Sequence, residues 1–290
     1  MNDAAVIEKI QYVIDGLTIQ GLACGNKADD IVLCLHGWLD NAASFIPLMT
    51  KLTGKRVIAI DWPGHGLSSH RTFDCHYHFV DYVNDLLMLF EHNQWTKLAV
   101  VGHSMGAMIA SAFAAAFPEK ISSLSLIDSI GFISAEPKNA TKQLRQGLQS
   151  RLKTAHKNKK NYLTIRSAVE ARMAVSDLKY SEAKLIINRS IKKTANGFEW
   201  RYDHRLRNIS PYRFTLQQAQ QIVSDIDARV QLIYGSHGLE IVRQGIKHFS
   251  PLIDGLQSHQ LTGGHHVHME KARQSAELIL FFICAKGIHE

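Results

Sequence analysis

Residues 100–107, VVGHSMGA, place Ser104 between two glycines directly after a run of small apolar residues. A strand that reverses into a helix within one or two residues forces the serine backbone into a strained conformation, in which neighbouring side chains would clash. Gly102 and Gly106 remove those side chains. The hydroxyl then lies at a helix N-terminus, where backbone N–H groups stabilise developing negative charge. The pattern predicts nucleophilic attack by Ser104.

A serine hydroxyl is a poor nucleophile until a base takes its proton, so a histidine is expected elsewhere in the chain. The segment GGHHVHMEKA offers His265, His266 and His268, and His265 follows two glycines after the last expected strand. We therefore predict that His265 is the base. The alternatives for this segment are surface loop histidines or a chance metal site. No matching cysteine or carboxylate cluster accompanies it, so no metal is expected.

The attacked carbonyl also needs two N–H donors that point at one spot. Met105, directly after the nucleophile, supplies one. The loop HGWLDN is expected to supply the other, because Gly37 permits a close approach and Trp38 follows with a backbone N–H. The alternative is that His36 and Trp38 are packing residues, but the carboxyl end of a strand favours a site.

Around these residues, expected strands and helices alternate. Apolar or alternating runs predict strands within residues 9–15, 17–25, 30–37, 55–61, 97–103, 121–128, 228–235 and 256–264. Helical spacing predicts helices within 42–52, 79–95, 105–118 and 270–287. Such alternation is typical of a mostly parallel sheet with helices on both faces, so the fold class is α/β.

The alternation stops at about residue 132. From there to about residue 225 the sequence has charged helical stretches and no convincing buried strand. We therefore expect a helical cap at 132–225, inserted into a core formed by 1–131 and 226–290. Arg201, Asp203 and Arg205 within the cap are expected to form ion pairs that support the fold; the alternative is that an arginine at the mouth of the cap holds a carboxylate of the substrate.

Length and composition restrict the domain organisation and the cellular compartment that we expect for the protein. The 290 residues, 46% of them hydrophobic, can fill one core with a sizeable insertion. No segment approaches the roughly 18 uninterrupted apolar residues of a membrane span, and the first residues lack a signal-peptide pattern. The four cysteines, Cys24, Cys34, Cys75 and Cys284, form no CxxC pair, so a reducing cytoplasm is expected.

The net charge of +7 raises the question of an acidic partner. The densest basic run, RLKTAHKNKKN at 151–161, has one aromatic residue nearby and no recognised nucleic-acid module around it. A solvated helix face explains the run better, and no nucleic-acid partner is expected.

The segments LHGWLDN, DWPGHGLSS, GHSMG and GGHHVHME, in this order and spacing, resemble the α/β-hydrolase superfamily over essentially the whole chain. RYDHRLRNISPYRFT at 201–215, together with LCLHGWLDNAASF, is similar to the serine hydrolase-like proteins. The resemblance implies an α/β-hydrolase fold without a cofactor. It implies Ser104 as nucleophile, His265 as base, and the N–H groups of Trp38 and Met105 as the oxyanion hole.

The acid that orients the histidine departs from the family pattern. Most members carry it as an aspartate three residues beyond the glycine that ends a late strand, where this chain has Gly238. In certain haloalkane dehalogenases the acid follows the preceding strand, which corresponds to Asp128. Glu240 is the other candidate. We favour Asp128, because the order Ser, Asp, His is retained and a strand end is more rigid than a loop.

A serine at this turn excludes the usual chemistry of dehalogenases and epoxide hydrolases, which use a carboxylate there. The leading hypothesis is a cofactor-independent carboxylic ester hydrolase that acts on a small-molecule ester through an acyl-enzyme. A thioesterase or carbon–carbon bond hydrolase with the same triad is the alternative enzyme. Because Gly238 stands where most members carry the acid, a ligand-binding protein with slow or absent turnover is the alternative outside enzymes.

Overall fold

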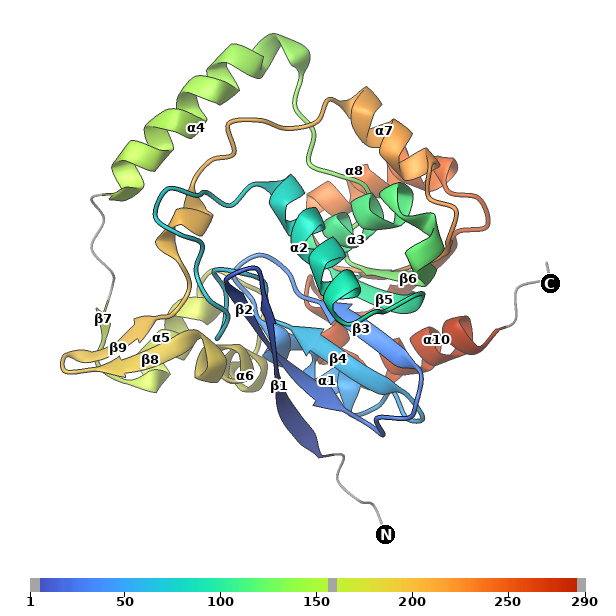
Figure 1. Ribbon diagram of the computed structural model, residues 1–290, viewed down its shortest axis with the longest axis horizontal. Helices are drawn as coiled ribbons and strands as arrows, with labels where there is room; N and C mark the ends of the chain where they lie inside the picture. Colours follow the sequence, from blue (N-terminus) through green and yellow to red (C-terminus); the bar gives the residue numbers. More distant parts are fainter. Residues whose placement is uncertain (1–5, 156–160, 286–290) are drawn as a thin grey trace.

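The computed structural model describes residues 6–155 and 161–285. Its main feature is an eight-stranded sheet in the order β1-β2-β4-β3-β5-β6-β10-β11 (Figure 1). The strands are β1 (Ile7–Ile14), β2 (Leu17–Cys24), β3 (Ile31–Leu35), β4 (Arg56–Ile60), β5 (Leu98–His103), β6 (Ile121–Ile127), β10 (Arg229–Gly235) and β11 (Gln257–Leu261). Pairs β1–β2 and β2–β4 are antiparallel, and the other five are parallel. The predicted α/β class and all eight predicted strands are confirmed.

Helices cover both faces of the sheet. They are α1 (Ile46–Met49), α2 (Phe79–His92), α3 (Met105–Ala116), α8 (Glu240–Phe249), α9 (Val267–Glu270) and α10 (Ala272–Cys284). The helix predicted within 42–52 is shorter than expected, because a 3-10 turn occupies Ala42–Phe45 and leaves only one turn to α1.

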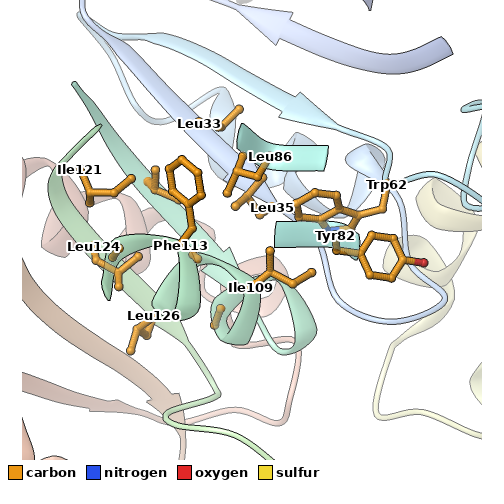
Figure 2. Packing of buried hydrophobic residues seen from close by; sticks show 14 of the residues in the cluster. Leu33, Leu35, Trp62, Tyr82, Leu86, Ile109, Phe113, Ile121, Leu124 and Leu126 are labelled. Carbon is orange, nitrogen blue, oxygen red and sulfur yellow. The ribbon is translucent and has the colours of Figure 1, made fainter. Parts of the chain in front are cut away.

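The central strands are buried on both faces, and successive residues contribute to different cores. Leu33 and Leu35 of β3 pack in one cluster with Leu86 of α2 and Phe113 of α3 (Figure 2). Their neighbours Val32 and Cys34 pack in a second cluster that includes residues of α1 and α10. This period of two explains why the strand reads as a continuous apolar run.

The segment after β6 contains more than the expected helices. Its elements are α4 (Ala140–Ala155), β7 (Asn161–Tyr162), α5 (Ile165–Met173), α6 (Tyr180–Ser190), β8 (Ile191–Thr194), β9 (Gly197–Trp200) and α7 (Leu216–Ser224). Besides the expected helices, the segment contains a small antiparallel sheet of β7, β9 and β8, which the sequence pattern did not predict. Strands of two to four residues are too short to produce a recognisable period.

Helix α7 packs against α3, and its Ala219 and Val223 belong to the core of the main sheet. The residues around α5 and α6 instead form a separate apolar cluster. The boundaries at 132 and 225 stay a prediction. Of the basic run at 151–161, the first five residues belong to α4, and 156–160 lie outside the described residues. Across 6–155 and 161–285, no helix is long and apolar enough to cross a membrane.

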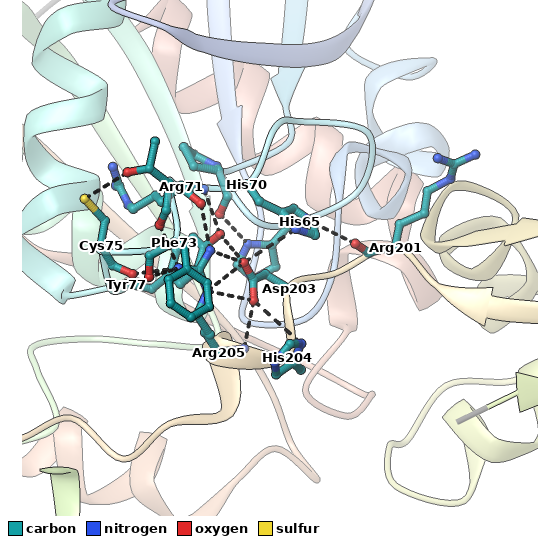
Figure 3. Close-up of polar contacts among 12 residues, drawn as sticks. His65, His70, Arg71, Phe73, Cys75, Tyr77, Arg201, Asp203, His204 and Arg205 are labelled. Atoms are coloured by element: carbon teal, nitrogen blue, oxygen red, sulfur yellow. Dashed lines mark hydrogen bonds and ion pairs between the residues drawn. The ribbon is translucent and has the colours of Figure 1, made fainter. Parts of the chain in front are cut away.

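An ion pair within the inserted segment, Asp203 with Arg205, makes hydrogen bonds to the loop before α2 (Figure 3). Asp203 accepts hydrogen bonds from Arg205 Nη2 at 2.6 Å and from Tyr77 Oη at 2.9 Å. Arg205 also donates to the carbonyl groups of Arg71, Thr72, Phe73 and Cys75. Arg201 donates its Nε–H to the carbonyl of Ile191. The predicted fold-supporting ion pair is therefore confirmed for Asp203 and Arg205.

Candidate active site

Ser104 lies in the turn between β5 and α3, with φ 51° and ψ −117°. A positive φ is costly for a residue with a side chain, so the predicted strain is present. An added Cβ at Gly102 would lie 2.6 Å from Cα of Ala107, and one at Gly106 would lie 2.1 Å from the carbonyl oxygen of Leu35. The turn can therefore form only because both flanking residues are glycine.

His265 hydrogen-bonds to both of its predicted partners. Its Nε2 lies 3.0 Å from Ser104 Oγ, and its Nδ1 lies 2.6 Å from Asp128 Oδ2. Because an ionised carboxylate only accepts, Nδ1 carries the hydrogen and Nε2 presents its lone pair to the serine hydroxyl. Asp128 is fully buried, and its Oδ1 accepts the backbone N–H of Gly235 at 2.9 Å.

The two candidate acids lie in different surroundings. Asp128 directly follows β6 with φ 44°, a conformation that turns the chain at the end of the strand. Glu240 begins α8, where its Oε2 accepts a hydrogen bond from Arg243 Nε at 2.7 Å, and its side chain is 64% exposed. Within the described residues, the carboxylate that contacts His265 is that of Asp128.

The loop after β3 lies against the nucleophile, since an added Cβ at Gly37 would be 3.1 Å from Ser104 Cβ. The carbonyl of Gly37 accepts hydrogen bonds from His36 Nδ1 at 2.7 Å and from the backbone N–H of Asp40 at 3.2 Å. These contacts fix the orientation of the peptide bond between Gly37 and Trp38.

The tautomer of His36 follows from its neighbours. Burial lowers the pKa of this histidine to about 4, so the ring is neutral at pH 7. Nε2 accepts the backbone N–H of Trp62 at 3.0 Å, which leaves the hydrogen on Nδ1. The chain has no cis peptide among the described residues, so the N–H of Trp38 points opposite to the carbonyl that His36 holds. The indole Nε1 of Trp38 donates to Leu206.

The next two histidines are buried, so the alternative of surface loop histidines is wrong for them. His266 is 4% exposed and His268 is fully buried. His266 Nδ1 lies 2.6 Å from Asp177 Oδ1, and its Nε2 lies 3.2 Å from Asp40 Oδ2. Arg172 Nη2 donates to the other oxygen of Asp40 at 2.6 Å.

Charge explains the protonation of this cluster. Burial acts to lower the pKa of His266, but the carboxylates of Asp40 and Asp177 outweigh it and raise the pKa to about 9. Burial, together with the nearby charge of His266, lowers the pKa of His268 to about 3. At pH 7 an imidazolium at His266 therefore lies beside a neutral imidazole at His268.

Asp40, His103 and His266 offer ligand atoms within 4.8 Å of one another, the spacing of a possible metal site. Asp40, however, already contacts the Arg172 guanidinium and the His266 imidazolium. Both oxygens of Asp40 are thus engaged by positively charged groups, which disfavours a further cation at this position.

The sequence gives no signal for the roles of Asp177 and Arg172, because their partners are distant in the chain. Gly264 is the one local clue. An added Cβ there would lie 2.1 Å from Asp177 Oδ2, so the double glycine before His265 makes room for a carboxylate from the inserted segment.

A cavity of about 360 Å³ opens onto Ser104 and His265. Most of its lining is apolar and comes from three places: the chain after β6, the start of α7, and α8 with the residue before it. These apolar residues include Ile130, Phe132, Leu216, Leu239, Ile241 and Val242. Polar groups such as Glu136 and His248 also line it. The size and the lining suit a small organic substrate with an apolar part.

Comparison with known proteins identifies the family to which the chain belongs. Residues 30–272 match the family model described as the alpha/beta hydrolase fold. A serine hydrolase-like protein of Danio rerio is 31% identical over 284 residues, which cover 91% of this chain and 85% of that protein. A serine hydrolase-like protein of Dictyostelium discoideum is also 31% identical, over 94% of this chain and 80% of the relative.

Two solved structures are similar over nearly the whole chain. A hypothetical protein of Pseudomonas aeruginosa PAO1 has 33% identity and a TM-score of 0.92, covering 96% of this chain and 100% of that one. The thioesterase domain from the curacin biosynthetic pathway has 25% identity and a TM-score of 0.85, covering 95% and 99%. The chain therefore belongs to the α/β-hydrolase fold family and, within it, to the serine hydrolase-like proteins.

Proposed function

We propose that the protein is a carboxylic ester hydrolase that uses Ser104 as nucleophile, His265 as base and Asp128 as the orienting acid. The observation that carries this proposal is the pair of hydrogen bonds made by His265, at 3.0 Å to Ser104 Oγ and at 2.6 Å to Asp128 Oδ2. A base held between a hydroxyl and a carboxylate in this order is the arrangement that activates a serine.

In the first half of the reaction, Ser104 Oγ attacks the ester carbonyl carbon while His265 Nε2 takes the hydroxyl proton. The N–H groups of Trp38 and Met105 stabilise the oxyanion. When the carbon–oxygen bond to the alcohol breaks, His265 returns the proton to the leaving alcohol and an acyl-enzyme remains. Water then attacks the acyl-enzyme with His265 again as base, and the carboxylic acid and free Ser104 are released.

The size and lining of the cavity favour a substrate with a small or medium acyl group. Ser104 and His265 share this cavity with apolar residues of the chain after β6 and of α8, and we expect an alkyl chain of the acyl group to pack against them. A volume of about 360 Å³ lies within the range of pockets that bind small organic ligands.

The test is hydrolysis of p-nitrophenyl esters of graded acyl length by wild type and Ser104→Ala, with a fluorophosphonate probe on both. We expect the probe to label only wild type, and the rate to fall by about 10³-fold or more in Ser104→Ala. Labelling without ester turnover would favour another substrate, and no labelling with no turnover would favour a binding protein.

A thioesterase is the second candidate, and one specific comparison favours it. The curacin thioesterase domain is 25% identical to this chain with a TM-score of 0.85. Thioesters and oxygen esters of the same acyl chain, offered at equal concentration, separate the two activities. A kcat/KM for the thioester that exceeds that for the oxygen ester by about 10-fold, or 1.4 kcal/mol, would favour the thioesterase.

A further inference from the structure

We propose that His266 is a positioning residue, through which Asp177 of the inserted segment holds the loop that carries the catalytic histidine His265. This proposal rests on the proposed function. It assigns to the inserted segment a role beyond covering the cavity, because one of its side chains then sets the position of the base.

The loop is held at three successive residues. The backbone N–H of Gly264 donates to Glu270 Oε1 at 2.8 Å. The carbonyl of His265 lies 2.9 Å from Nε2 of His103. The backbone N–H of His266 donates to Asp177 Oδ2 at 3.1 Å, while Asp177 Oδ1 pairs with the ring Nδ1 of the same residue. Of these holding groups, Asp177 alone comes from the inserted segment.

The same ring reaches the other side of the site. Its Nε2 contacts Asp40, which lies in the loop that presents Trp38, and Asp40 in turn contacts Arg172 of α5. The chain of contacts Asp177–His266–Asp40–Arg172 therefore begins and ends in the inserted segment. It passes through the loop of the base and the loop of the expected oxyanion donor, so a shift of α5 is transmitted to both.

The ionised form of His266 is what both carboxylates require, because each ring nitrogen must donate. Two carboxylates, those of Asp40 and Asp177, face the His266 ring directly. Two further charged groups lie one contact away, since Arg172 pairs with Asp40 and Glu270 accepts from Gly264. The other titratable groups beside the ring are the imidazoles of His103, His265 and His268. Loss of the proton would remove one of the two ring contacts and loosen the loop.

The test compares Asp177→Asn with Glu170→Gln, a matched change of a carboxylate to an amide in the same segment. Glu170 pairs with Arg166 on the exposed face of α5 and does not contact the loop. The Asp177 side chain is 29% exposed, which favours folding of the variant. Circular dichroism and thermal melting at pH 7 establish that both variants are folded.

In Asp177→Asn we expect kcat to fall by about 10-fold with KM changed by less than about 2-fold, since the base rather than substrate binding is displaced. Wild-type kcat should fall as the pH rises through about 9, the pKa of His266. In Asp177→Asn one of the two carboxylates that raise the pKa of His266 is neutral, so this alkaline decrease in kcat (the alkaline limb) should occur closer to neutral pH. A purely structural role would lower the amount of folded enzyme and leave the limb in place.

Hydrogen exchange of the peptide that contains residues 263–266 gives a measurement independent of turnover. Faster exchange in Asp177→Asn than in Glu170→Gln supports the hold on the loop. Unchanged exchange, or unchanged kcat and alkaline limb, would overturn the proposal. A wild type without Ser104-dependent turnover refutes the hydrolase function instead, while exchange still decides whether Asp177 holds the loop.

Discussion

Gly238 lies against the carboxylate of Asp128, so closely that a Cβ atom added at residue 238 would be 2.6 Å from Oδ1 and 2.9 Å from Oδ2. The position at which the family resemblance implies an acid and the carboxylate of Asp128 thus occupy neighbouring space. A side chain at residue 238 would displace this carboxylate, so the present position of Asp128 requires glycine at 238.

Gly238→Ala should therefore impair catalysis by displacing Asp128. We expect kcat/KM for an ester to fall by about 10-fold or more, with a small change in the melting temperature, because the atom that must move ends a side chain. A double-mutant cycle with Asp128→Asn tests the cause. If the alanine acts through this carboxylate, its effect should largely disappear in the Asp128→Asn background, whereas additive losses would refute the mechanism.

The acid itself is tested by two isosteric changes. Asp128→Asn should lower kcat by about 10²- to 10⁴-fold, because the amide no longer holds the reactive tautomer of His265 or stabilises its imidazolium. Glu240→Gln should remain within about 2-fold of wild type, since Glu240 is exposed and pairs with Arg243. Both are measured with the same p-nitrophenyl ester. A larger loss in Glu240→Gln would mean that α8 supplies the acid.

Short sequence motifs were enough to predict Ser104 and His265 as partners. The strained turn requires glycines on both sides of the serine, and the double glycine directly precedes the histidine. The structure places their side chains within hydrogen-bond distance. Seven of the eight strands were predictable for the same reason, since each is a run of five or more residues with a clear apolar pattern. The eighth, β11, reads QSHQL and contains one apolar residue, so its apolar pattern alone does not predict it.

Contacts between distant residues were not predictable in this way. Asp177 and His266 are 89 positions apart, and Asp40 and His266 are 226 apart. Neither carboxylate belongs to a recognisable sequence motif. The sequence therefore does not distinguish a histidine buried between two carboxylates from a histidine on a surface loop. The choice between Asp128 and Glu240 was similarly a question of tertiary structure, because both follow strands that end near the site.

His266 should make stability depend on pH on the alkaline side. Its pKa is about 9 in the folded protein against 6.5 as the ordinary value, so the folded state binds the proton more tightly. The contribution is complete below about pH 6.5 and lost as the pH rises through 9, on the order of 3 kcal/mol. Urea unfolding at pH 6, 7.5 and 9 measures it. His266→Gln should flatten this dependence, and an equal slope in both proteins would contradict the assignment.

The apolar side of the cavity should decide acyl length. Ile241 lines the cavity and is 44% exposed, so Ile241→Asn changes its wall at little risk to the fold. We expect kcat/KM for the octanoyl ester, divided by kcat/KM for the acetyl ester, to fall by about 10-fold. The octanoyl chain would lose its apolar contact with residue 241, whereas the acetyl group is too short to make that contact. Val175→Asn is the control, since Val175 is 73% exposed and does not line the cavity. An equal change of the ratio in both variants, or an unchanged ratio in Ile241→Asn, would contradict this contact between Ile241 and the acyl chain.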